Sequence, residues 1–106
     1  MESSFKSKLV KDLRSMFDDD AIILKNDANY LQGVPDILIL YGDKWAVLEC
    51  KDSFDSPYRV NQEYYIKKMD DMSFARMICP ENKEEVLNAV HKALRHSRSA
   101  RVSFRI

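Results

Sequence analysis

The sequence predicts a single α/β domain in which a mixed β-sheet is flanked by helices, with the element order αβββαβαβ. The chain has 106 residues, 45% of them hydrophobic and 32% charged, which is typical of one globular domain. Apolar residues recur at helical spacing in three segments, and short β-branched or aromatic runs lie between these segments. With only two glycines and no internal repeat, we expect one compact unit over residues 1–106.

The first helix is expected over residues 3–17. Phe5, Leu9 and Leu13 recur at intervals of four, with lysines and aspartates between them, so one face of this helix is apolar. Glu2 extends the apolar stripe at its start. We therefore expect this helix to pack against the sheet through that stripe.

Three strands are predicted next, from the runs AIILK (21–25), DILILY (36–41) and KWAVLEC (44–50). The last two runs are separated by Gly42-Asp43, a pair that is typical of two-residue hairpin turns. These two strands should therefore form an antiparallel hairpin.

A second helix is expected from Pro57 to about Met72, because proline suits the first helical turn. The run FARMIC (74–79) predicts a fourth strand, and a third helix is expected from Pro80. The closing segment ARVSFRI (100–106) alternates apolar and cationic residues, which indicates an additional C-terminal strand. That strand would either complete the sheet of its own chain or pair across a two-fold axis.

The composition favours an intracellular protein. The chain has no apolar run near the 20 or so residues of a membrane helix, and its first residues lack the apolar centre of a secretory signal. Cys50 and Cys79 lack metal-finger spacing and lie in apolar runs, so we expect reduced core residues. A cytoplasmic location, in a bacterial or phage-infected cell, is the expectation.

Positive charge is unevenly distributed although the formal net charge is zero. Basic residues gather near both ends of the chain, where they could bind phosphates or form solvated helix faces. The two groups are Lys6, Lys8, Lys11 and Arg14, and Lys92, Arg95, Arg98, Arg101 and Arg105.

The predicted hairpin places two carboxylates opposite each other. Pairing through Gly42-Asp43 places Asp36 opposite Glu49, and Lys51 projects from the same face as Glu49. Opposed carboxylates destabilise a sheet, whereas a bound divalent cation that prefers oxygen ligands, Mg²⁺ or Mn²⁺, would offset the repulsion between them. The backbone carbonyl of Cys50 would lie near the same cluster. The alternative is a surface charge cluster in which Lys51 neutralises one carboxylate.

Pro35-Asp36, followed by Glu49-Cys50-Lys51, resembles the PD-(D/E)xK signature of the restriction-endonuclease-like nucleases. The longer phrase GVPDILILYGDKWAVLECK, then NQEYY and FARMICPENKEEVLNAVHKAL, resembles the VRR-NUC (virus-type replication-repair nuclease) family. The resemblance implies a restriction-endonuclease-like αβββαβ core, with an extra C-terminal helix and strand.

The resemblance also implies roles for individual residues. Asp36, Glu49, the Cys50 carbonyl and Glu2 would bind the metal, with Lys51 as the catalytic lysine and Gln62 lining the site. Gln62 has independent support, since it shares a helical stripe with Tyr58, Tyr65, Ile66 and Met69 and should face the sheet. The alternatives are a Gln62 amide bonded to backbone at the core edge and a Glu2 that interacts with the helix dipole.

The expected function is a Mg²⁺- or Mn²⁺-dependent, structure-selective DNA endonuclease that resembles Holliday junction resolvases. Symmetric cleavage of a junction needs two sites and therefore a homodimer. The alternatives are a nicking, flap or end-processing nuclease of a larger phage or bacterial complex, and a catalytically silent nucleic-acid-binding module. The expected nucleic-acid contacts are Lys6, Lys8, Lys11, Arg59, Arg95, Arg98, Arg101, Arg105 and Tyr30.

Overall fold

The computed structural model describes residues 4–26 and 31–95. Its element order is α1 (Ser4–Phe17), β1 (Ala21–Lys25), β2 (Ile37–Tyr41), β3 (Lys44–Cys50), α2 (Gln62–Met72), β4 (Ala75–Ile78) and α3 (Lys83–Arg95), with a short 3₁₀ turn, Asp18–Asp20, after α1. The domain is α/β, as the sequence predicts, and the bounds of β1 and β3 are the predicted ones.

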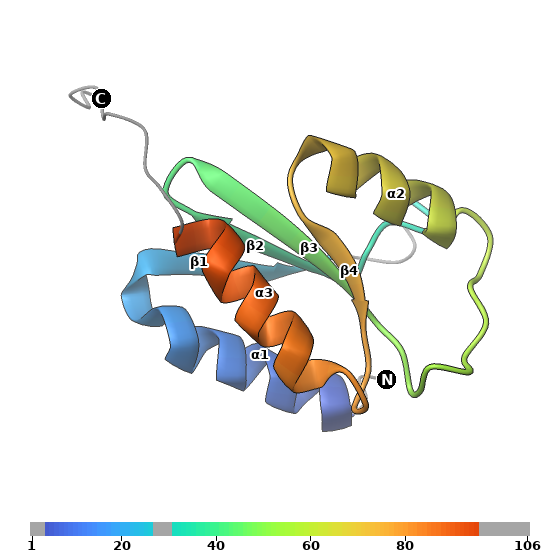
Figure 1. The fold of residues 1–106 in the computed structure, drawn as a ribbon, viewed down its shortest axis with the longest axis horizontal. Coiled ribbons are helices and arrows are strands. Elements are labelled where there is room, and N and C mark those ends of the chain that lie inside the picture. The colour runs from blue at the N-terminus through green and yellow to red at the C-terminus, as the bar shows by residue number, and fades with distance from the viewer. Residues whose placement is uncertain (1–3, 27–30, 96–106) are drawn as a thin grey trace.

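The strands form one mixed sheet in the order β1-β2-β3-β4 (Figure 1). The pairs β1–β2 and β2–β3 are antiparallel, whereas β4 runs parallel to β3. Helix α2 connects these two parallel strands, because a parallel pair needs a crossover connection rather than a tight turn. Among the described residues, β1 and β4 are therefore the outer strands.

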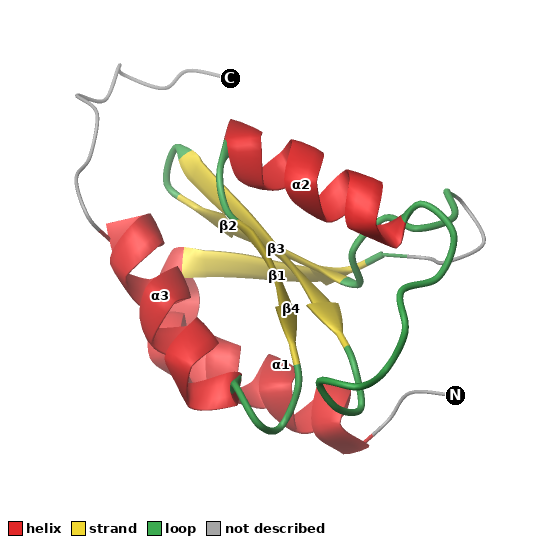
Figure 2. Ribbon diagram, turned by 45° about the vertical axis from the view of Figure 1, so that its right-hand side comes forward, coloured by secondary structure: helices red, strands yellow, loops and turns green. Residues whose placement is uncertain are grey.

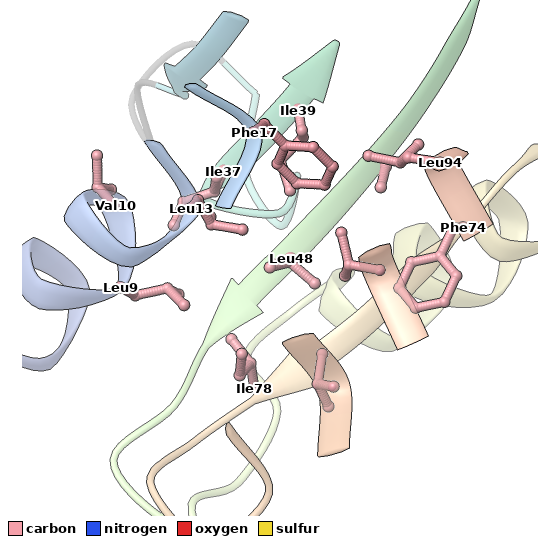
Figure 3. Packing of buried hydrophobic residues seen from close by; sticks show 13 residues of the cluster. Leu9, Val10, Leu13, Phe17, Ile37, Ile39, Leu48, Phe74, Ile78 and Leu94 are labelled. Carbon is pink, nitrogen blue, oxygen red and sulfur yellow. The ribbon is translucent and has the colours of Figure 1, made fainter. Parts of the chain in front are cut away.

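The helices lie on both faces of the sheet. Figure 2 shows α1 and α3 on one face and α2 on the other. The hydrophobic core lies on the α1 and α3 side, where Figure 3 shows side chains from both helices and from the strands packing together. Its members include Leu9, Leu13, Phe17, Ile37, Ile39, Leu48, Ile78, Val90 and Leu94.

The predicted hairpin register is confirmed. Tyr41 pairs with Lys44, Leu40 with Trp45, and the ladder continues to Ile37 and Leu48. Gly42 has a φ of 60°, a conformation that glycine adopts without a steric penalty. The next position along the same register would bring Asp36 beside Glu49.

The second helix begins later than the sequence predicts. Pro57 lies in a loop, and α2 starts at Gln62 rather than at residue 57. Asn61, immediately before the helix, has a φ of 69°, which is incompatible with a right-handed helix running through it. The start predicted from Pro57 was therefore wrong, and Tyr58 does not belong to the stripe of α2.

The third helix also begins late, at Lys83 rather than Pro80. The backbone carbonyl of Asn82 accepts the first helical hydrogen bond, from the Val86 N–H, so Asn82 is the cap. Its side chain accepts from the Cys79 N–H and donates to the Met77 carbonyl, which fixes the turn after β4. The predicted strand 100–106 lies outside the described residues. None of the described helices has the length and apolar character needed to cross a membrane.

Candidate functional site

Three charged side chains gather at the end of the sheet where β2 begins and β3 ends. Asp36 directly precedes β2, Glu49 lies within β3, and Lys51 directly follows β3. Glu49 and Lys51 are only 4% and 8% exposed. Burial at this level is uncommon for ionisable residues unless they are paired, so their partners decide what the cluster can do.

Both carboxylate oxygens of Asp36 have partners. Oδ2 accepts a hydrogen bond from the Cys50 backbone N–H at 2.9 Å, and Oδ1 lies 3.4 Å from the Lys6 ammonium. The first contact ties the residue before β2 to the last residue of β3. The second reaches it from α1, so three elements position this carboxylate.

Gln62 connects Lys51 to Glu49. Its side-chain N–H donates to Glu49 Oε2 at 2.6 Å, while its Oε1 accepts from Lys51 Nζ at 2.5 Å and from the Arg59 backbone N–H at 2.7 Å. Lys51 Nζ also donates to the Pro57 carbonyl at 3.0 Å. Gln62 is the one buried residue of α2 and bonds to Glu49 of β3, so the expectation that it faces the sheet is confirmed.

The pKa of Glu49 is raised to about 7, chiefly by burial and then by the negative charge of nearby Asp36, against the lowering effect of Lys51 and Lys6. A carboxyl group with such a pKa releases its proton readily when a cation is offered. Perturbed carboxyls of this kind are concentrated at functional sites.

One oxygen of Glu49 is incompletely satisfied. Among the described residues Oε1 is buried and has no hydrogen-bond partner. A buried acceptor without a partner is costly, and a bound cation would remove that cost. Asp36 and Glu49 supply a small number of hard oxygen ligands, which fits Mg²⁺ or Mn²⁺.

The carboxylates do not by themselves form a larger metal cluster. Across residues 4–26 and 31–95, no group of three or more His, Cys, Asp or Glu side chains is placed to bind a metal. The predicted set requires the Cys50 carbonyl and Glu2 in addition. Glu2 lies outside the described residues, and the role of the carbonyl stays a prediction.

Two loops pack closely behind the site. Gly33, in the loop before Asp36, has a φ of 94°, and a Cβ atom there would lie 2.7–2.8 Å from atoms of Val60 and Asn61. Only glycine permits this approach. The loop that leads to Asp36 is thus packed against the loop that leads to Gln62.

The remaining predicted nucleic-acid contacts are scattered. Lys8 and Lys11 are exposed on α1, and Arg59 is exposed in the loop before α2. Arg95 lies at the opposite end of the sheet from the carboxylates, with its guanidinium over the rings of Phe17 and Tyr41. The structure therefore does not bring Arg95 to the site. Tyr30, Arg98, Arg101 and Arg105 lie outside the described residues.

Two contacts were not anticipated. Lys6, which the sequence analysis grouped with the phosphate-binding lysines, forms an ion pair with Asp36. The centre of the Tyr58 ring lies 5.4 Å from Lys51 Nζ. A signal for Lys6 was present, because Lys6, Val10, Leu13 and Phe17 follow the heptad spacing of one helix face. Tyr58 carried no such signal, since its loop has no periodicity.

Comparison with protein-family models, with curated proteins and with solved structures finds no match to this chain. The function must therefore be argued from the site itself.

Proposed function

We propose that this protein is a divalent-metal-dependent DNA endonuclease, which hydrolyses phosphodiester bonds at the cluster of Asp36, Glu49, Lys51 and Gln62. The observation that carries the proposal is the Glu49 carboxylate, which is buried, faces a second acid, and has one oxygen without a hydrogen-bond partner among the described residues. The proposal also draws on the resemblance of the sequence to VRR-NUC nucleases and to the restriction-endonuclease-like signature.

The metal would be held by Asp36, Glu49, the Cys50 carbonyl and Glu2. A bound Mg²⁺ or Mn²⁺ would supply a Lewis acid that activates water and neutralises charge on the scissile phosphate. The remaining chemistry falls to side chains that the structure positions.

Lys51 is suited to orient the attacking water or to stabilise the charge that develops on the phosphate. Its ammonium is fixed by the Pro57 carbonyl and Gln62 Oε1, so little reorganisation would be needed during the reaction. Gln62 acts on both partners at once, because it accepts from Lys51 and donates to Glu49. It is a positioning residue in this proposal.

Recognition by DNA shape fits the described residues better than recognition of a base sequence. No helix or ribbon with the character of a base-reading module stands out in the described segments, and exposed cations such as Lys11 and Arg59 suit phosphate contacts. Branched or junction DNA is the substrate that we favour, as in the resolvases that the family resembles.

The test is a cleavage assay on labelled duplex, flap, single-stranded and four-way DNA with Mg²⁺, Mn²⁺ or EDTA. We expect metal-dependent cleavage that Asp36→Asn, Glu49→Gln and Lys51→Ala each abolish, a loss of roughly 3 kcal/mol or more of transition-state stabilisation apiece. Binding measured in EDTA should persist in these variants, because phosphate contacts lie elsewhere.

Asp20→Asn is the matched control, since Asp20 is an exposed acid in the turn after α1. Near-wild-type cleavage by Asp36→Asn or Glu49→Gln would contradict the metal site. Binding without cleavage of any substrate would instead favour the catalytically silent module, and cleavage restricted to flaps or nicks would exclude junction resolution.

The protein is proposed to act as a homodimer, so that two sites face one junction. The described residues offer a surface for this at β1, an outer strand whose Ile22 and Leu24 side chains are 59% and 45% exposed. An outer strand with apolar side chains favours pairing with a second chain.

Light scattering at micromolar concentration measures the assembly. We expect a mass near twice the 12.4 kDa of one chain, and a shift toward the monomer in Leu24→Lys. Lys44→Leu, at the hairpin turn away from β1, serves as the surface control. A wild-type mass near 12.4 kDa that junction DNA leaves unchanged would contradict the dimer.

A further inference from the structure

Asn26 directly follows β1 and holds the two residues that lead into β2. Its backbone N–H donates to the Asp36 carbonyl at 2.7 Å, and its side-chain Nδ2 donates to the Pro35 carbonyl at 2.6 Å. The first bond continues the β1–β2 pairing by one position beyond Lys25 and Ile37. The second bond requires a side-chain donor, which most residue types at the end of a strand would not supply.

These bonds complete a frame around Asp36 that reaches from β1 to β3. The carbonyls of Pro35 and Asp36 belong to the two peptide units that flank the Asp36 Cα, so Asn26 fixes the backbone on both sides of this residue. On the β3 side, the Cys50 N–H holds the carboxylate itself, through Oδ2. Asp36 is therefore restrained at its backbone by one strand and at its side chain by another.

The rigidity of a carboxylate ligand affects Mg²⁺ and Ca²⁺ differently. Mg²⁺ requires near-octahedral ligands at about 2.0–2.1 Å, whereas Ca²⁺ accepts a flexible set of oxygens at about 2.3–2.6 Å. Residues that orient a ligand without touching the metal affect metal affinity in the same way as the ligands do. A carboxylate restrained from two strands should therefore favour the smaller ion, and loosening it should weaken Mg²⁺ binding more than Ca²⁺ binding.

We infer that Asn26 determines the metal preference of the site: by holding the peptide units on both sides of Asp36, it keeps this carboxylate where Mg²⁺ binds in preference to Ca²⁺. The inference rests on the proposed function, because it takes Asp36 as a metal ligand. Asn26 is a positioning residue, since its two bonds go to backbone carbonyls and it acts on the metal through Asp36.

The test measures the binding of both ions to the full chain. Calorimetric titrations at pH 8.5, where Glu49 with its pKa of about 7 is ionised, give one Kd for Mg²⁺ and one for Ca²⁺. In Asn26→Ala the Kd for Mg²⁺ should rise by about tenfold, as in other proteins that lose a residue orienting a ligand. The Kd for Ca²⁺ should rise by about threefold or less, because Ca²⁺ tolerates a less rigid carboxylate. The ratio of the two Kd values is the quantity that decides.

Asn26→Asp is the second variant. It keeps the shape of the side chain and the backbone N–H, but its ionised carboxylate cannot donate to the Pro35 carbonyl. The added charge attracts both divalent cations, so it affects the two Kd values in the same direction. The Kd ratio should therefore shift as it does in Asn26→Ala.

Asn82→Ala is the matched control. Asn82 is half-buried like Asn26, and its side chain also bonds to backbone groups, those of Cys79 and Met77 in the turn after β4. Urea denaturation in EDTA should show a comparable loss of stability in Asn26→Ala and Asn82→Ala, because each loses side-chain bonds to the backbone. Only Asn26→Ala should change the Kd ratio.

The possible outcomes separate the two proposals. A Kd ratio that neither Asn26 variant changes, or that Asn82→Ala changes equally, would overturn the inference and leave Asn26 as a structural residue at the end of β1. If the wild-type protein also cleaves DNA, the proposed function stands without it. A wild-type protein that binds neither ion would refute the proposed metal site and this inference together. A shifted ratio in a protein that cleaves no DNA would support the metal preference and contradict the nuclease.

Discussion

The two faces of β3 are both buried, but they differ in the chemistry of their side chains. Leu48 and Glu49 are neighbours in sequence and are 0% and 4% exposed, but they project from opposite faces of the sheet. Leu48 enters the core beneath α1 and α3, whereas Glu49 faces α2 and its amide partner Gln62. One strand thus supplies both the packing of the domain and the chemistry of the site.

The difference extends to the helices. Helices α1 and α3 each contribute several fully buried apolar side chains, while the one buried residue of α2 is Gln62. Apolar burial on the first face stabilises the fold directly. On the second face the apolar Val47 is buried together with the ionisable Glu49 and Lys51, so part of the contribution of that face depends on protons and on bound cations. The first face should therefore respond to packing mutations, and the second to pH and metal.

The largest effect is expected on the core face. Leu48→Ala leaves a cavity beneath α1 and α3 and should lower the free energy of unfolding by about 3 kcal/mol, measured by urea denaturation. Leu31→Ala is the matched control, because Leu31 is 45% exposed in a loop and should cost well under 1 kcal/mol. A loss below about 1 kcal/mol in Leu48→Ala would show that this face does not carry the stability.

A smaller effect, a loss of folding stability as the pH rises, is expected on the site face. The pKa of Glu49 is raised to about 7 in the folded protein, chiefly by burial, from its ordinary value of 4.5. The folded state therefore binds this proton more tightly than the unfolded state, and the resulting stability is complete below pH 4.5. It is lost as the pH rises through 7, and allowing for screening by solvent we expect a loss of about 2 kcal/mol.

Urea denaturation of the protein in EDTA from pH 4.5 to 8.5 measures this loss. Glu49→Gln should remove it and should be the more stable protein at pH 8.5, because its amide stays neutral while its oxygen can still accept from Gln62. The informative quantity is the difference between the two profiles, since other carboxyls such as Asp12, whose pKa is lowered beside Lys83, titrate in both proteins. Parallel profiles would show that Glu49 is not the group responsible.

Local sequence determined the secondary-structure elements and placed Asp36 beside the end of β3. A two-residue turn at Gly42-Asp43 fixes which residues face each other, and side-chain alternation then decides which face each one takes. Periodicity likewise placed Gln62 toward the sheet, because the apolar stripe of a helix shows which side is covered. These inferences succeeded because their physical causes act over a few residues.

The tertiary structure alone decided the start of α2, the position of Lys6 and the separation of Arg95 from the site. Residues 57–61 stay outside the helix because the Pro57 carbonyl is engaged by Lys51 and the Asn61 backbone turns left-handed against Gly33. Lys6 reaches Asp36 across 30 positions of sequence, and Arg95 stacks on rings of α1 and β2. Contacts between distant segments depend on how the elements pack, and neither composition nor local periodicity encodes that packing directly.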